Sequence, residues 1–162
     1  MSDNKAIWKV LEEVCDPEIP VLSIIDLGIV RKINHEASGI EIVITPTYSG
    51  CPALKQMEAD IKSSLLAHGY TNIRVNTTLS PAWTTDWMSE AGKIKLKSYG
   101  IAPPHPTMTV CNLQMFQEEE AIQCPRCNSY NTQLVSRFGS TACKALYRCN
   151  DCSEPFDYFK CH

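Results

Sequence analysis

The chain has 162 residues, a net charge of −3, 44 % hydrophobic residues and 20 % charged residues, which excludes a disordered chain and allows one ordinary domain with a small second module. No concentrated positive footprint favours nucleic acid as a partner, and no apolar stretch is long enough to span a membrane. The first residues lead into an amphipathic segment rather than a signal peptide, so we expect a cytoplasmic protein.

The front of the chain begins with an amphipathic helix. Ile7, Val10, Leu11 and Val14 recur at helical spacing, and Asp16-Pro17 should end the helix because the residue before a proline avoids the helical conformation. A short strand over 29–33, a turn over 34–39 and a strand with Ile40, Ile42 and Ile44 on its core face should follow.

A second helix is predicted to open at Cys51-Pro52 and to stop at Gly69, with Leu54, Met57, Ile61 and Leu65 on one face. Residues 73–79 alternate as a third strand. The order α-β-β-α-β predicts an α+β fold, in which helices cover a small sheet. The spacing of the cysteines after residue 123 adds a C-terminal zinc ribbon.

Three domains are expected. Residues 1–100 form the front domain, in which 83–99 is an aromatic, lysine-bearing segment with a short helix. Residues 101–123, with three prolines and the acidic run 118–120, form a linker, and 124–162 form the ribbon.

The tail predicts a metal site. Cys124, Cys127, Cys149 and Cys152 form two Cys-x-x-Cys pairs, and such pairs aim four sulfurs at one tetrahedral centre. So short a stretch needs a metal to fold, and structural zinc is favoured, although mononuclear iron or an iron–sulfur cluster would suit the same ligands. Strands are expected at 134–135, 145–147 and 156–159.

Cys143 has two interpretations. It is either a small core residue beside the metal, with Cys161 and His162 at a frayed end, or a thiol for transient metal or cluster transfer. In the second case, Lys144 beside it would favour the thiolate.

Cys51 is the candidate reactive residue of the front domain. At a helix start, free N–H groups and the helix dipole should lower its pKa, and Thr45, Thr47 and Ser49 surround it with hydroxyl groups. It is either a nucleophile or soft-metal ligand, or simply a poor cap.

Asp16, Glu18 and Asp26 are the acidic candidates, with an ordinary Asp-Pro turn as the alternative. Their sequence spacing brings none of them to Cys51. The histidines show no paired metal spacing.

Several runs resemble a known family. The front domain resembles iron–sulfur assembly factors of the SufT type, through Asp16–Pro20, Ser23–Val30 and Thr45–Pro52. The chain is also similar to one branch of that family, the phenylacetate-degradation (PaaD) family, through Trp83–Met88, Tyr99–Pro104, Phe138–Lys144 and Phe156–Cys161.

The resemblance implies an accessory role beside the multicomponent monooxygenase that epoxidises phenylacetyl-CoA, with its oxygenase or reductase subunit as partner. It implies delivery of iron or an iron–sulfur cluster, with the family's reactive cysteine at Cys51 and its Asp-Pro-Glu at 16–18, although Tyr48-Ser49-Gly50 replaces the commoner residues. No di-iron, flavin or dinucleotide motif is visible, so no catalytic activity of its own is expected.

Two alternative functions and the oligomeric state are left open. The chain is a stoichiometric subunit of the epoxidase that binds its partner through Trp83 and Trp87, or a nucleic-acid binder, which the near-neutral tail disfavours. Whether it forms a homodimer is not decided by the sequence.

Overall fold

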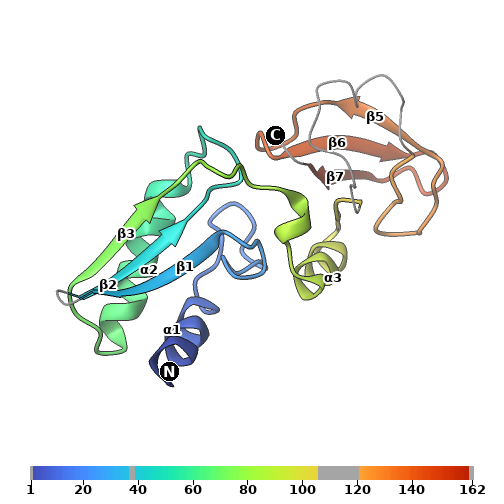
Figure 1. The fold of residues 1–162 in the computed structure, drawn as a ribbon. Helices are drawn as coiled ribbons and strands as arrows, with labels where there is room; N and C mark the ends of the chain where they lie inside the picture. Colours follow the sequence, from blue (N-terminus) through green and yellow to red (C-terminus); the bar gives the residue numbers. More distant parts are fainter. Residues whose placement is uncertain (1, 37–38, 106–120, 161–162) are drawn as a thin grey trace. The chain divides into compact units, whose positions relative to one another are not determined.

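The structure is a computed structural model that describes residues 2–36, 39–105 and 121–160 (Figure 1). The chain divides into two compact units. The first comprises Met1–Trp83 and Trp87–Gly92, and the second comprises Thr84–Asp86 and Lys93–His162. Each is described by itself below.

The first unit has the predicted α-β-β-α-β order and confirms the α+β class. Its elements are α1 (Ser2–Leu11), β1 (Val30–Glu36), β2 (Gly39–Ile44), α2 (Leu54–Ala67) and β3 (Ile73–Thr77). Strand β2 lies in the middle, antiparallel to β1 and parallel to β3. Helix α2 connects the parallel pair and packs on β3, and α1 packs on α2 (Figure 1). The predicted strand face is confirmed, because Ile42 and Ile44 are fully buried.

Helix α1 is shorter than predicted. It ends at Leu11, although Val14 remains buried with the rest of the apolar stripe. The backbone turns away because Cys15 bridges to Ser23, and the Asp16 N–H donates to the Leu22 carbonyl at 2.8 Å. The loop that follows therefore competes successfully for the backbone groups that a longer helix would have used.

Helix α2 stops where the sequence predicts. Gly69 has φ +85°, and the N–H groups of Gly69 and Tyr70 donate to the carbonyls of Leu66 and Leu65. This pairing is a Schellman motif, which requires a left-handed residue that glycine adopts without strain.

The segment after β3 is held to the loop before β1. The Trp83 indole N–H donates to the Leu27 carbonyl at 2.8 Å, and the Arg31 guanidinium carbon lies 3.5 Å from the centre of the Trp87 ring. Gly28 has φ +67°, and a Cβ there would lie 2.2 Å from the Trp87 carbonyl oxygen. The expected short helix appears as a 3-10 turn (Thr85–Trp87) followed by α3 (Glu90–Tyr99).

The second unit contains a four-stranded sheet in the order β4-β7-β6-β5. Its strands are β4 (Ile101–Ala102), β5 (Thr132–Ser136), β6 (Lys144–Cys149) and β7 (Pro155–Phe159). The three strands expected in the tail are confirmed as the antiparallel set β5-β6-β7. Strand β4, parallel to β7, was not predicted because two residues carry no periodic signal.

Both described ends of the expected linker belong to the second unit. Ile101 and Ala102 form β4, and Ile122 is buried with the ribbon cysteines. Cys111 and the acidic run 118–120 lie outside the described residues, as do Cys161 and His162. None of the helices in the described part of the chain combines the length and apolar character that a membrane crossing requires.

Candidate metal centre and reactive cysteine

The four cysteines predicted as metal ligands converge in the second unit. The Sγ atoms of Cys124 and Cys152 lie 3.8 Å apart, those of Cys127 and Cys149 lie 3.5 Å apart, and all four lie within 4.8 Å of one another. Sulfurs at the corners of a tetrahedron with Zn–S bonds of about 2.3 Å lie roughly 3.8 Å apart. The donor set therefore fits one zinc ion with four thiolate ligands. When bound, such an ion supplies folding free energy rather than reactivity.

Backbone N–H groups of the two knuckles point at these sulfurs. Hydrogen bonds from the Cys152 and Asp151 N–H groups, with the neighbouring thiols, lower the pKa of Cys149 to about 7. The Ser129 N–H lowers the pKa of Cys127, but desolvation and the three neighbouring thiols outweigh it and raise the pKa of Cys127 to about 12. A cation bound among these thiols would displace the protons that they retain.

A polar clasp joins the two knuckles, and the sequence analysis missed it. Asp151 accepts hydrogen bonds from the Ser129 hydroxyl at 2.5 Å and from the Asn131 side-chain amide at 2.7 Å. Asn150 donates to the Asn131 side chain at 3.0 Å. The hydrogen bonds of Ser129 and Asn131 lower the pKa of Asp151. The clasp therefore connects the two knuckles through side chains that are not metal ligands.

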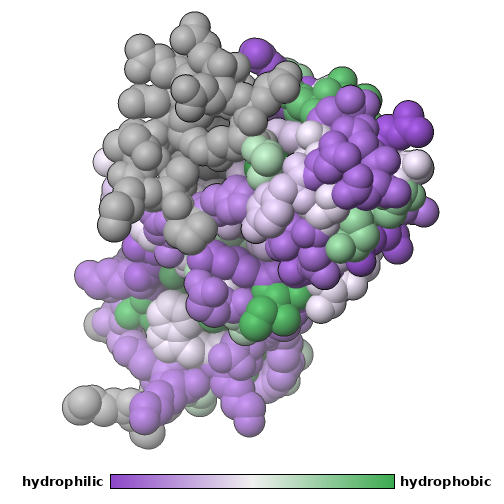
Figure 2. Space-filling model, turned by 90° about the vertical axis from the view of Figure 1, so that its right-hand side faces the viewer, coloured by the Kyte–Doolittle hydropathy of each residue, from purple (hydrophilic) through white to green (hydrophobic). Residues whose placement is uncertain are grey.

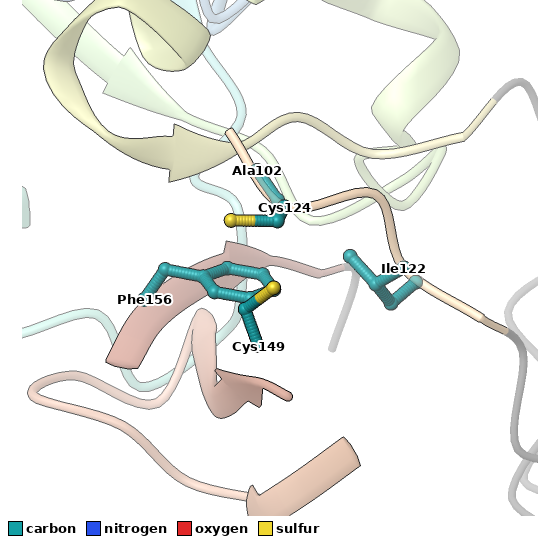
Figure 3. Packing of buried hydrophobic residues seen from close by; sticks show 5 residues of the cluster. All are labelled: Ala102, Ile122, Cys124, Cys149 and Phe156. Carbon is teal, nitrogen blue, oxygen red and sulfur yellow. The ribbon is translucent and has the colours of Figure 1, made fainter. Parts of the chain in front are cut away.

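An apolar shell covers one side of the sulfur cluster. Cys124 and Cys149 are buried together with Ala102, Ile122 and Phe156, as Figure 3 shows. Tyr147 stacks on Phe156 with ring centroids 5.9 Å apart. Because Ala102 and Ile122 come from the expected linker, residues outside the run 124–162 help to cover this side of the metal site.

Cys51 lies before α2, but not as its N-cap. The helix begins at Leu54, Ala53 occupies the cap position, and no side chain caps the helix. The backbone N–H groups of Ala53 and Leu54 nevertheless act on the Cys51 thiol and lower its pKa, while the Leu54 N–H donates to the Cys51 carbonyl at 3.3 Å. The thiol therefore sits at the helix start as expected, two residues earlier along the chain than an N-cap.

The expected low pKa of Cys51 is wrong. Burial raises its pKa most strongly, the Ala53 and Leu54 N–H groups lower it, and the carboxylates of Glu18 and Asp16 raise it further, so the net change is upward. The fold thus brings to Cys51 the two acidic residues that sequence spacing could not connect to it. A cation would stabilise this thiolate, whereas an anion would be repelled.

Asp16 and Asp26 also have structural partners. Asp16 Oδ1 accepts hydrogen bonds from the N–H groups of Glu18 and Ile19, both at 2.8 Å, as the Asp-Pro turn predicts. Asp26 accepts from the Ser23 hydroxyl at 3.0 Å and from the Ser89 hydroxyl at 2.9 Å, and it therefore joins two segments of the first unit. Thr47, the remaining candidate, is half-buried in the same loop as Cys51.

Cys143 is buried, and its cationic neighbour is not the expected one. The Thr141 hydroxyl lies 3.0 Å from the Cys143 sulfur. The charge of the Cys143 thiolate acts on Lys160, and the backbone N–H of Lys160 donates to the Cys143 carbonyl at 3.0 Å. Lys144 is buried, with its Nζ 3.9 Å from Asp157. The pairing of Lys144 with Phe159 places residues 143 and 160 side by side, which only the strand register reveals.

Comparisons with known proteins agree with this organisation. The family described as "Iron-sulfur cluster assembly protein" matches residues 4–75, and the family described as "PaaD zinc beta ribbon domain" matches residues 109–160. A crystal structure of a domain of unknown function, DUF59, from Bacillus anthracis is similar, with TM-score 0.54 and 32 % identity, covering 57 % of this chain and 89 % of that chain. The fold and the sulfur site therefore define an iron–sulfur-assembly-type domain joined to a zinc ribbon.

Two curated relatives narrow the class. The Staphylococcus aureus (strain USA300) "Fe-S protein maturation auxiliary factor SufT" is 38 % identical over 51 % of this chain and 96 % of that protein. A protein from Escherichia coli (strain K12), named as a putative subunit of 1,2-phenylacetyl-CoA epoxidase, is 50 % identical over 96 % of this chain and 91 % of that protein. The chain belongs to the family of this epoxidase component, the PaaD family.

Proposed function

We propose that the protein is an accessory factor of the phenylacetyl-CoA epoxidising monooxygenase and assists iron loading of its oxygenase or reductase subunit. The family relationship supports the pathway, because the E. coli relative is named as a subunit of that epoxidase. The match to iron–sulfur assembly proteins and the likeness to SufT support a role in metal delivery.

The observation that carries the proposal is the surroundings of Cys51. The backbone N–H groups of Ala53 and Leu54 favour its thiolate form, and the carboxylates of Asp16 and Glu18 lie close enough to act on its charge. A soft thiolate beside hard carboxylate oxygens suits ferrous iron held as cargo. Cys51 is half-buried, so the ion would be accessible for transfer, unlike a metal held by four sulfurs in the ribbon.

The test is reconstitution of the epoxidase. Oxygenase and reductase subunits produced without this protein are incubated anaerobically with ferrous iron, sulfide and either wild type or Cys51→Ser, and the metal bound to each subunit is measured. We expect wild type to increase bound iron and Cys51→Ser to lose most of the increase. Cys15→Ser is the matched control, because Cys15 is an exposed cysteine of the same unit. Equal loading with wild type, with Cys51→Ser and with no added protein would refute the role.

One observation favours a second candidate function. The E. coli relative carries the name of a subunit, which suggests a stoichiometric component of the epoxidase complex. The sequence analysis expects Trp83 and Trp87 to bind the partner in that role. The expectation is wrong for Trp83, because its side chain is only 6 % exposed and donates a hydrogen bond to the Leu27 carbonyl of its own unit. Co-purification at a fixed ratio through two columns would favour a subunit, whereas sub-stoichiometric recovery together with restored iron loading would favour a transient factor.

A homodimer is an alternative that the sequence analysis leaves open. Light scattering of the zinc-loaded protein over a hundredfold concentration range decides it. A constant mass near 18.1 kDa would exclude self-association in that range.

A further inference from the structure

The two units differ in the exposure of large apolar side chains. Among the described residues, six of the eight exposed large hydrophobic ones belong to the second unit. Four of these six fall between residues 130 and 138: Tyr130, Leu134, Val135 and Phe138. Figure 2 shows one face of the molecule, on which hydrophobic residues, in green, are scattered among hydrophilic ones, in purple. We call these four residues the β5 strip.

The β5 strip lies on a sheet edge. Strand β5 ends the order β4-β7-β6-β5, and among the described residues it pairs with β6 alone. A bulge at Val135 interrupts that pairing, because Leu134 faces Tyr147 and Ser136 faces Leu146. A bulge breaks strict alternation, so neighbouring side chains need not point to opposite faces. Leu134 and Val135 are 36 % and 55 % exposed, although a regular half-buried strand would hide one of the two.

Positive charge surrounds the strip. Arg148 is paired with Gln133 across the sheet, and Arg137 follows β5 directly. The Lys160 ammonium lies 4.4 Å from the centre of the Phe138 ring and donates to the Arg137 carbonyl at 2.6 Å. Burial lowers the pKa of Lys160, and the Arg137 charge lowers it further, so the two cations lie close together.

Two of the three acidic residues in the described part of the ribbon, 121–160, are engaged elsewhere, and the third, Glu154, is exposed. Asp151 is held by Ser129 and Asn131, and Asp157 lies 3.9 Å from Lys144 and 3.3 Å from the Ser140 hydroxyl. The described residues of the second unit include eight cationic and four acidic side chains, a net charge of +4 with neutral histidine. With the acidic run 118–120 of the same unit and four thiolates around one Zn²⁺, the formal charge of the unit comes to −1, so the positive charge is local to the strip and not general to the unit.

We propose that the β5 strip and its flanking cations form a docking surface for an acidic, apolar segment of a partner protein, which adds to the edge of β5 that no described residue pairs with. The proposal rests on the function given above, because it takes that partner to be the epoxidase subunit that receives iron. A strand edge offers unpaired N–H and C=O groups, exposed apolar side chains supply burial, and the cations select a partner segment that carries carboxylates.

A single-stranded nucleic acid is the competing occupant, since it also binds aromatic and basic surfaces. The strip favours protein because its centre is aliphatic. Leu134 and Val135 offer no ring on which a base could stack, and the phosphate contacts of nucleic acids need a denser row of cations than Arg137, Arg148 and Lys160 provide.

The test measures the affinity of the zinc-loaded full chain for the purified oxygenase and reductase subunits by fluorescence anisotropy. Val135→Glu should weaken binding to the recipient subunit at least tenfold, because it places a charge in the apolar strip and repels an acidic segment. Leu66→Glu is the matched control, since Leu66 is 57 % exposed on α2 of the first unit, and it should bind as wild type does. Unchanged zinc content of both variants shows that the ribbon is folded.

Arg148→Glu provides a second variant that does not alter the apolar strip. It should weaken binding severalfold, and added salt should weaken the wild type toward the same affinity. The proposal is overturned if Val135→Glu binds as tightly as wild type, if Arg148→Glu binds more tightly, or if wild type binds neither subunit. Salt-sensitive binding of a single-stranded oligonucleotide that is lost in Val135→Glu would also overturn it.

The two proposals fail in different ways. If iron loading depends on Cys51 but Val135→Glu binds normally, the docking surface is wrong and the proposed function stands. If Val135→Glu loses binding while iron loading proceeds equally well without the protein, the docking surface stands and the proposed function is wrong.

Discussion

The carboxylate of Asp151 accepts a hydrogen bond of 2.7 Å from the side-chain amide of Asn131, and it thereby connects the second cysteine knuckle to the chain that leaves the first. Asp151 lies between the ligands Cys149 and Cys152, whereas Asn131 precedes β5. The metal ligands are therefore oriented by polar contacts that are not themselves ligands.

Removing this contact should loosen the zinc. Asp151→Ala is expected to accelerate zinc transfer to a colorimetric chelator by about 10-fold, since outer contacts of this kind are typically worth 10- to 100-fold in metal affinity. Glu154→Ala is the control, because Glu154 contributes its backbone to Cys149 and Cys152 while its side chain is exposed. Equal rates for the three proteins would show that the clasp does not influence the metal.

Stripping the metal should unfold the ribbon and leave the first unit intact. Zinc binding at such sites is worth about 10–16 kcal/mol, and the buried core around Cys124 and Cys149 is small. Hydrogen exchange after chelation should therefore show loss of protection in β5, β6 and β7 but not in α2. Protected amides throughout the metal-free ribbon would contradict the prediction.

Neutralising Glu18 should make Cys51 more reactive. The Glu18 carboxylate contributes to the raised pKa of Cys51, so Glu18→Gln should lower that pKa and increase the thiolate fraction at a given pH below it. The rate of iodoacetamide labelling of Cys51 between pH 7 and 9, followed by peptide mass spectrometry, should rise accordingly. Glu12→Gln, at an exposed position of the same unit, should leave the rate unchanged. A slower Cys51 in Glu18→Gln would show that the carboxylate acts in another way.

A side chain at Gly28 should destabilise the first unit. Gly28→Ala combines the left-handed backbone, at about 1–2 kcal/mol, with a Cβ only 2.2 Å from the Trp87 carbonyl oxygen. Gly69→Ala shares the left-handed backbone but meets nothing within 4 Å, so it separates strain from collision. Urea unfolding should therefore rank wild type, Gly69→Ala and Gly28→Ala in decreasing stability, and equal losses for the two variants would remove the collision as a cause.

Much of the fold could be predicted from local patterns. The apolar spacing of Met57, Ile61 and Leu65 defines a helix face, and the alternation around Ile42 and Ile44 defines a strand face. Gly69 ends α2 for a reason contained in its own conformation. These features are predictable because residues a few positions apart fix them.

The metal ligands were predictable for a related reason. Each knuckle closes within four residues, so the spacing of Cys124 and Cys127 already implies one half of a sulfur site, and the second knuckle supplies the other half. The clasp formed by Asp151 and Asn131 was not predictable, since aspartate and asparagine are ordinary turn residues and nothing in their spacing pairs them.

The sequence by itself determined the helical and strand periods, the family resemblance and the four sulfurs of one site. Only the tertiary structure decided that Asp16 and Glu18 act on Cys51, that Lys160 lies beside Cys143, and that Trp83 is buried in its own unit rather than free for a partner. The physical reason is the same in each case: these residues meet through loop closure and strand register, and contacts between segments distant in sequence leave no period in the chain that would reveal them.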